Sequence, residues 1–171
     1  MRRVFTDAGM TVETVDLSAS LKSESSGDFH SKLEAATGGL PWRETDLVIC
    51  NTMVSFWAVH AARRAGLPVL MYVHESAHIR RFFAPSLSPA LMPLVESAFR
   101  EATRVVFTAD SSHAVFSYLV YRGNFVSLPS WVDVARVDAF AAGHQKDALR
   151  RKHGLDPDAV LVVNIGSICE R

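Results

Sequence analysis

The chain has 171 residues, of which 49% are hydrophobic and 21% are charged. This composition excludes a disordered tail, a collagen-like repeat and a coiled coil. Eighteen basic residues balance eighteen acidic ones, so the basic excess that usually accompanies nucleic-acid binding is missing.

Short apolar runs alternate with segments of helical spacing along the whole chain. Alternation and β-branched residues predict a strand at 11–17, whereas six serines in residues 18–31 predict a flexible surface loop. Continuous apolar runs predict buried parallel strands, at residues 46–50, 68–73, 105–108, 125–128 and 159–165. Helical spacing predicts helices at residues 52–65, 88–101, 110–121 and 145–153, the third with Asp110 or Ser111 as its N-cap. This order predicts an α/β fold with a doubly wound, mostly parallel sheet.

The two ends of the chain suggest an incomplete pair of domains. The chain opens on the tail of a helix closed by Gly9, without the strand and tight turn that begin a doubly wound sheet. The run at 159–165 is followed by too few residues for a covering helix. We therefore expect one domain at 1–130 that lacks its first strand, a connector at 131–158, and the first strand of a truncated domain at 159–171.

The lengths of the apolar stretches and the positions of the two cysteines predict where the protein is located and the redox state of Cys50. Arg2 and Arg3 have no apolar region behind them, and no apolar stretch approaches the ~20 residues of a membrane span. Cys50 lies in an apolar run, far in sequence from Cys169, which favours a reduced, buried thiol. We expect a cytoplasmic protein.

The segment His74-Glu75-Ser76-Ala77-His78 matches the zinc-peptidase motif H-E-x-x-H, with Glu96 as a conceivable third ligand. That motif requires both histidines on one helical face, but a buried strand precedes His74 and places it at a strand end. Ligands of open α/β sheets bind at such ends, where a histidine can donate or accept a hydrogen bond. A third reading makes His74 only a cap of the following helix.

Two other segments carry polar or basic residues of interest. Residues 108–113 form a hydroxyl-rich turn without the spacing of a nucleophile elbow, so helix capping is the preferred reading. Residues 78–83 combine basic and aromatic side chains, which fits a solvated loop best and a membrane-facing or phosphate-facing patch second. No glycine-rich dinucleotide fingerprint or Walker sequence occurs.

Taken in order, several segments resemble the N-terminal domain of the retaining glycosyltransferases of family four, which have the GT-B fold of two facing Rossmann-like domains. Residues 46–51 (DLVICN) resemble the family's "D-h-V-h-h" strand, where h is apolar, and residues 66–75 its "G-h-P-h-h-h-h-x-H-[DE]" element. Residues 102–111 are similar to "A-D-x-V-h-x-x-S", residues 127–133 to "h-I-P-N-G-V-D", and residues 161–171 to the opening of the second domain.

The resemblance implies transfer of a sugar, with retention, from a nucleotide-sugar donor to an acceptor. It makes His74 the catalytic-site residue that contacts donor sugar or acceptor, with Glu75 and Ser111 as substrate-binding residues. The nucleotide-sugar is a substrate, so no cofactor and no metal is implied, and the nucleotide belongs to the absent second domain. Ser167 stands where many members have a diphosphate-binding arginine. We therefore expect residues 1–130 to be the acceptor-side domain, and this chain alone to transfer no sugar.

The expected partners are a sugar acceptor and a nucleotide-sugar, with peripheral contact at the inner face of the membrane as a further possibility and no nucleic acid. Three competing functions stay open. The chain could be a non-catalytic α/β binding module, or a zinc metallopeptidase using His74, Glu75 and His78. A nucleotide-sugar epimerase would need a glycine fingerprint and a Tyr-x-x-x-Lys pair, neither of which the sequence contains.

Overall fold

The computed structural model describes residues 2–84 and 86–163. The chain divides into two compact units, Met1–Pro129 and Ser130–Arg171.

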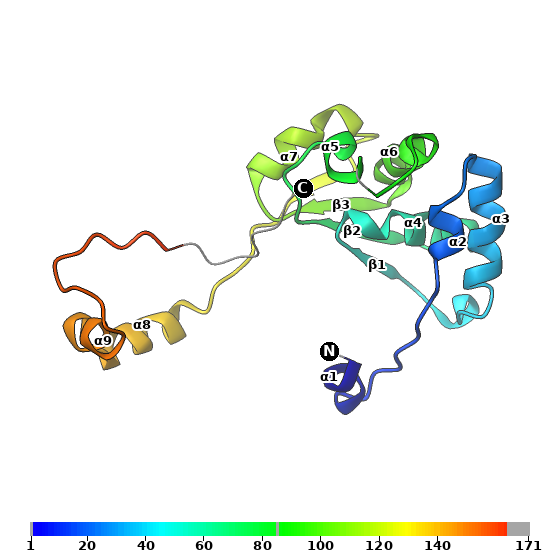
Figure 1. Ribbon diagram of the computed structural model, residues 1–171. Coiled ribbons are helices and arrows are strands. Elements are labelled where there is room, and N and C mark those ends of the chain that lie inside the picture. The colour runs from blue at the N-terminus through cyan, green and yellow to red at the C-terminus, as the bar shows by residue number, and fades with distance from the viewer. Residues whose placement is uncertain (1, 85, 164–171) are drawn as a thin grey trace. The chain divides into compact units, whose positions relative to one another are not determined.

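The first unit contains a four-stranded, all-parallel sheet (Figure 1). Its strands are β1 (Val48–Asn51), β2 (Val69–Val73), β3 (Arg104–Phe107) and β4 (Phe125–Ser127). Their spatial order is β1-β2-β3-β4, so each strand pairs with its neighbour in sequence. Helices flank the sheet, which confirms the predicted α/β class, and four adjacent parallel strands in chain order are consistent with one half of a Rossmann-like, doubly wound architecture.

Helices and short 3-10 turns connect the strands. Before β1 lie α1 (Arg2–Asp7), α2 (Ser18–Leu21), α3 (Ser26–Thr37) and the turn η1 (Trp42–Glu44). Between β1 and β3 lie η2 (Met53–Ser55), α4 (Phe56–Arg64), α5 (Ile79–Phe83), η3 (Pro89–Leu91) and α6 (Met92–Glu101). Between β3 and β4 lie α7 (Asp110–Phe116) and η4 (Ser117–Leu119). Because strand order follows chain order, right-handed crossovers place α4, α6 and α7 on one face of the sheet.

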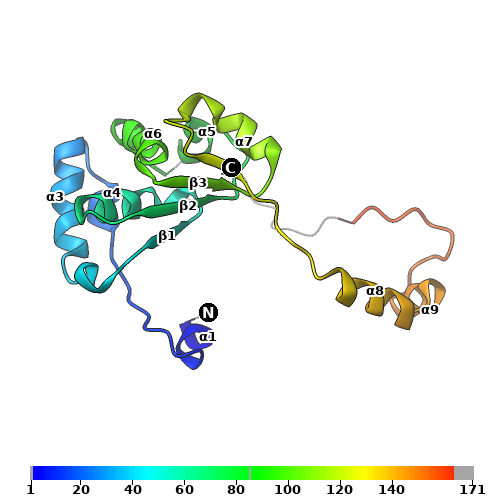
Figure 2. The ribbon, with the colours of Figure 1, turned by 180° about the vertical axis from the view of Figure 1, so that it is seen from behind.

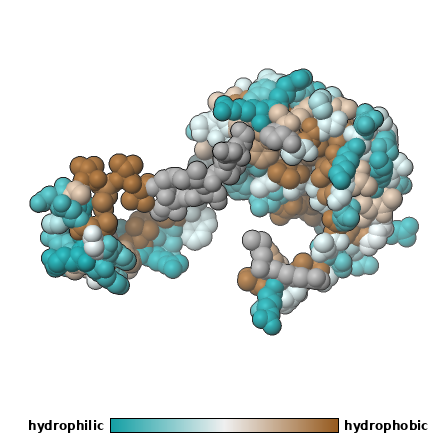
Figure 3. Space-filling view, viewed as in Figure 1, coloured by the Kyte–Doolittle hydropathy of each residue, from teal (hydrophilic) through white to brown (hydrophobic). Residues whose placement is uncertain are grey.

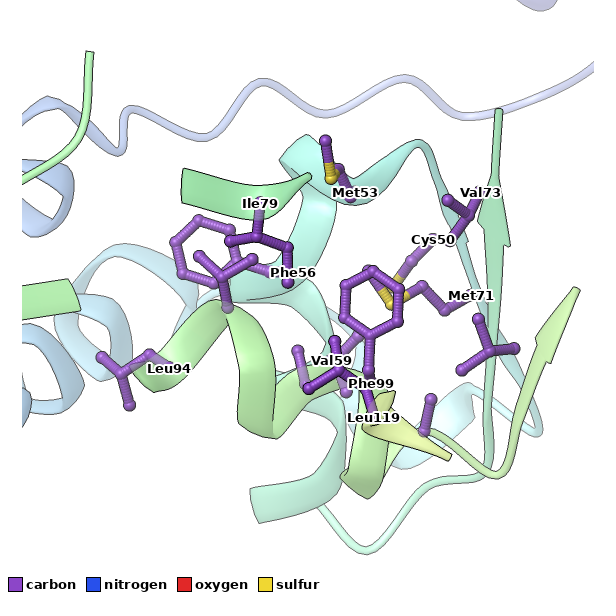
Figure 4. Close-up of a cluster of buried hydrophobic side chains, with 14 of the residues drawn as sticks. Cys50, Met53, Phe56, Val59, Met71, Val73, Ile79, Leu94, Phe99 and Leu119 are labelled. Atoms are coloured by element: carbon purple, nitrogen blue, oxygen red, sulfur yellow. The ribbon is translucent and has the colours of Figure 1, made fainter. Parts of the chain in front are cut away.

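The core lies between that face and the helices. Val59 of α4 and Phe99 of α6 lie near Met71 and Cys50 of the sheet, whereas Phe56 of α4 lies beside Ile79 (Figure 4). All six side chains are at most 2% exposed. Their apolar burial is the main stabilising contribution to this unit. Burial also raises the pKa of the Cys50 thiol to about 12, so Cys50 is the protonated, free cysteine that the sequence predicts.

A buried polar cluster joins α3, α4 and α6. His60 is 3% exposed, and its Nε2 lies 2.9 Å from the carbonyl oxygen of Leu94, which can only accept a hydrogen bond. Its Nδ1 lies 3.2 Å from Oε2 of Glu101. The ring of His30 meets that of His60 edge to face at 5.3 Å, and Nδ1 of His30 is buried without a hydrogen-bond partner in the described structure.

Two expectations for the N-terminal region are wrong. Residues 11–17 form no strand, because no described strand lies beside them and an isolated strand has no ladder to stabilise it. Residues 18–31 are not a loop but contain α2 and the start of α3. The serine-rich composition concealed an N-cap, since Ser25 accepts from the backbone N–H of Asp28, and Phe29 becomes fully buried one turn later.

The second unit contains two exposed helices, α8 (Val134–Gly143) and α9 (Lys146–Lys152). Residues 159–163 form no strand, contrary to the sequence pattern, and residues 164 and 165 of that predicted strand lie outside the described residues. Val160 and Val162 are more than 90% exposed, so these side chains lack the burial that a strand of this composition requires. Hydrophobic side chains accordingly reach the surface of this unit (Figure 3).

Candidate functional site

The candidate site lies at the carboxyl ends of β1 and β2. β2 ends at Val73, His74 follows directly, and α5 begins only at Ile79. The strands and the helix can be followed from both sides of the sheet (Figures 1 and 2). His74 is exposed and lies in irregular chain, where the strand pattern of the sequence predicts it. In parallel sheets this edge is where ligands bind.

The imidazole of His74 is fixed by neighbours on both strands. Its Nε2 lies 2.8 Å from Oδ1 of Asn51, the last residue of β1. An amide oxygen can only accept, so Nε2 carries a proton and neutral His74 has a free lone pair on Nδ1. The ring of Tyr72 contacts the imidazole at a tilt, with the two ring centroids 5.6 Å apart. The side chain therefore offers solvent an oriented hydrogen-bonding nitrogen.

Glu75 ties the two strand ends together. Its Oε2 accepts from the backbone N–H of Met53, at 3.2 Å, and from that of His74, also at 3.2 Å. The side chain is half-buried and crosses from the β2 end to the loop after β1. One carboxylate oxygen is thus used to orient the loop, while no hydrogen bond within the described structure engages the other, Oε1.

The backbone is strained at Thr52, directly after the site residue Asn51. Thr52 follows Asn51 and precedes Met53, and it has φ of 72° with ψ of 155°. A β-branched residue in this region of the map costs about 1–3 kcal/mol, and such strain clusters at functional sites. The hydrogen bond from Thr52 N to the carbonyl of Tyr72, at 2.7 Å, holds the strained residue against β2.

The geometry does not fit the zinc-peptidase reading. His74 and His78 flank an irregular segment, so they do not share a helical face. The side chain of His78 serves α5 instead: its Nδ1 accepts weakly from the backbone N–H of Arg80, at 3.4 Å, and its ring stacks on Tyr118. Among the described residues no group of three histidine, cysteine, aspartate or glutamate side chains could hold a metal ion.

Residues 79–83 form the helix α5, with His78 as its N-cap, whereas the sequence favoured a solvated loop over residues 78–83. Ile79 and Phe83 of α5 are buried, and Phe83 packs edge to face against Phe56. Arg80 and Arg81 are exposed. Ile79 and Phe83 therefore belong to the core, and the basic residues Arg80 and Arg81 face outward.

Ser111 lies elsewhere along the same edge, in the first turn of α7 after β3. It is exposed, and no hydrogen bond given by the described structure joins it to His74 or Glu75. The expected N-cap of α7, Asp110 or Ser111, is wrong, because Ala109 occupies the cap position and no side chain caps the helix. Ser111 is therefore free of the capping role that would compete with ligand binding.

Sequence reasoning missed two residues of the site, Asn51 and Thr52. Asn51 is the polar residue that ends a buried strand, the same signal that singles out His74. Its partnership with His74 depends on the register of β1 and β2, in which Asn51 lies opposite Tyr72. The strain at Thr52 has no signal in the sequence, since its conformation is one that glycine would usually adopt.

Within the described residues, no helix has both the length and the apolar character needed to cross a membrane. A scan against models of protein families and a search of curated proteins both find no match, so the family resemblance rests on the motifs of the sequence alone.

Proposed function

We propose that this chain is the acceptor-side part of a retaining glycosyltransferase, with His74 at the reaction centre. The proposal rests on the ordered motifs of the sequence. The structural observation that supports it best is the His74 imidazole, exposed at the carboxyl end of β2 and oriented by Asn51.

The chemistry joins an acceptor oxygen to the anomeric carbon of the donor sugar. The bond between that carbon and the nucleotide diphosphate breaks, and the acceptor proton ends on the departing diphosphate. Such a reaction depends on positioning the two substrates and on stabilising the leaving group. The residues described at this edge can supply positioning, since they include oriented neutral hydrogen-bonding groups.

His74 would act through Nδ1, which can accept a hydrogen bond from a sugar hydroxyl while Asn51 holds Nε2. Glu75 would keep the loop after β1 in place and leave Oε1 for the acceptor. Ser111 would contribute a hydroxyl from α7. In this proposal the groups that bind the nucleotide lie outside residues 1–130.

The direct test is a transfer assay on the gene product that contains residues 1–171. Radiolabelled nucleotide-sugars would be offered with a panel of hydroxylated acceptors, and the anomeric configuration of any product would be determined by NMR. Transfer with retention would support the proposal. Zinc-dependent cleavage of a peptide panel would instead favour the metallopeptidase, and ligand binding without turnover would favour the non-catalytic binding module.

A further inference from the structure

A second polar pair lies at the carboxyl ends of β3 and β4. Nδ1 of His113, on α7, is 3.0 Å from Oγ of Ser127, the last residue of β4. Ser127 is exposed and His113 is half-buried. The pair therefore occupies the ligand-binding edge of the sheet on strands other than those that carry His74.

Aromatic packing fixes the His113 ring. It stacks on Phe107 at 5.1 Å with an interplanar angle of 3°, and it meets Phe125 edge to face at 5.7 Å. Both phenylalanines are buried in the core. A ring held in this way loses little conformational entropy when it binds a ligand. Its Nε2 makes no hydrogen bond within the part of the chain that the structure describes.

The proton count of the pair indicates what it can bind. If Ser127 donates to Nδ1, the pair offers Nε2–H as a donor and the serine oxygen as an acceptor. If Nδ1–H donates to Ser127, the pair offers the serine O–H as a donor and Nε2 as an acceptor. In both tautomers of neutral His113 one donor stands beside one acceptor, which matches hydroxyl groups because each is donor and acceptor at once.

Charge argues against an anion at the same place. Residues 105–121 and 123–135 contain no lysine or arginine. Arg104 begins β3 and Arg122 precedes β4, so both belong to the amino ends of these strands. The exposed carboxylate of Asp110 lies three residues before His113 on α7, close enough to repel a negative ligand.

From this geometry we infer that His113 and Ser127 form a binding subsite for a neutral ligand with two adjacent hydroxyl groups. The inference goes beyond the proposed function, because it predicts binding by the chain without any donor or transfer step. If the His74 centre does transfer sugars, the same subsite would hold part of a hydroxylated acceptor.

The test is an NMR titration that follows the imidazole nitrogens of the full chain. The probes are myo-inositol and a methyl glucoside as neutral polyols, and inorganic phosphate as the anion. The pH is set about one unit above the reference histidine pKa of ~6.5. The variants are Ser127→Ala, which removes the hydroxyl, and His113→Phe, which keeps the aromatic stack.

We expect a polyol to shift the His113 signals, and Ser127→Ala to weaken its affinity by about 3- to 10-fold, the effect of losing one neutral hydrogen bond. Ser117→Ala is the matched control, since within the described residues its hydroxyl bonds only the carbonyl of Ala114. The signals of His144, which also stacks on a phenylalanine, should stay unchanged.

Three results would overturn the inference. The first is a shift with phosphate but none with the polyols, which would make the pair an anion site. The second is polyol binding of equal strength in the Ser127→Ala variant. The third is no shift with any probe up to high millimolar concentration. Because these readouts need no sugar transfer, they fail or succeed separately from the assay of the proposed function.

Discussion

The Oδ1 atom of Asn51 lies 2.8 Å from Nε2 of His74, which joins the last residue of one strand to the first residue after the next. The two residues are 23 positions apart, and the parallel pairing of β1 with β2 brings them together. The bond fixes one tautomer of His74 and leaves Nδ1 for a ligand.

Replacement of Asn51 should therefore disturb His74 without unfolding the chain. In Asn51→Ala we expect loss of the preference for the Nε2–H tautomer, read from the imidazole nitrogen shifts, and a transfer rate about 10-fold lower in the gene product. Ser55→Ala is the control, because it removes only the hydroxyl that bonds the Asn51 carbonyl. An unchanged tautomer ratio in Asn51→Ala would show that Asn51 does not position the ring.

Glu75 should contribute to stability as well as to the site. Glu75→Ala leaves the N–H groups of Met53 and His74 without their acceptor, and we expect the free energy of unfolding to fall by about 1–3 kcal/mol. Glu75→Gln keeps an oxygen and should lose less. Urea denaturation measures the stability of both variants. Equal stability of Glu75→Ala and the parent would show that the two hydrogen bonds accepted by Glu75 do not stabilise the chain.

Relief of strain at Thr52 should stabilise the chain. Glycine tolerates φ of 72° at no steric cost, so we expect Thr52→Gly to raise the free energy of unfolding by about 1 kcal/mol despite the entropy of an added glycine. Thr14→Gly, at an exposed position without a positive φ, should lower the free energy of unfolding or leave it unchanged. A loss of stability in Thr52→Gly would mean that the strain is small.

Stability should fall in two steps as the medium becomes acidic. Burial, reinforced by His60, lowers the pKa of His30 below its ordinary 6.5. The unfolded chain then binds the proton first, so stability is lost as pH falls from about 6.5 through the lower folded value. The hydrogen bond from His60 lowers the pKa of Glu101 below its ordinary 4.5. Because the unfolded chain again binds the proton first, the free energy of unfolding falls further as the pH drops below about 4.5.

Urea denaturation between neutral pH and about pH 5 isolates the first step. His30→Gln should remove most of that pH dependence, whereas His153→Gln, at an exposed position, should keep it. If His30→Gln keeps the full pH dependence, another group titrates in this range.

The sheet was predictable because buried parallel strands have continuous apolar sequences. Residues 46–50 and 68–73 have that character, and they correspond to β1 and β2. Local patterns failed at 11–17, where the signal was alternation, and at 159–163, where it was a continuous apolar run, since either pattern becomes a strand only where another strand pairs with it. That partner is a property of the tertiary structure, which local patterns do not contain.

The site was predictable only in part, for a related reason. The position of His74 after a buried strand follows from local pattern. The hydrogen bonds between Asn51 and His74 and between His113 and Ser127 join different strands and helices, so they depend on register and helix packing. The double role of Glu75, toward Met53 and His74, likewise depends on the pairing of β1 with β2.

The most direct measurement is the sugar-transfer rate of His74→Ala in the gene product that contains residues 1–171, with the free energy of unfolding measured alongside. We predict a rate at least ~10²-fold lower, because a group at the reaction centre is lost, and a stability within about 0.5 kcal/mol of the parent, because the side chain is exposed. An unchanged transfer rate would contradict the account and leave His74 with a purely structural role.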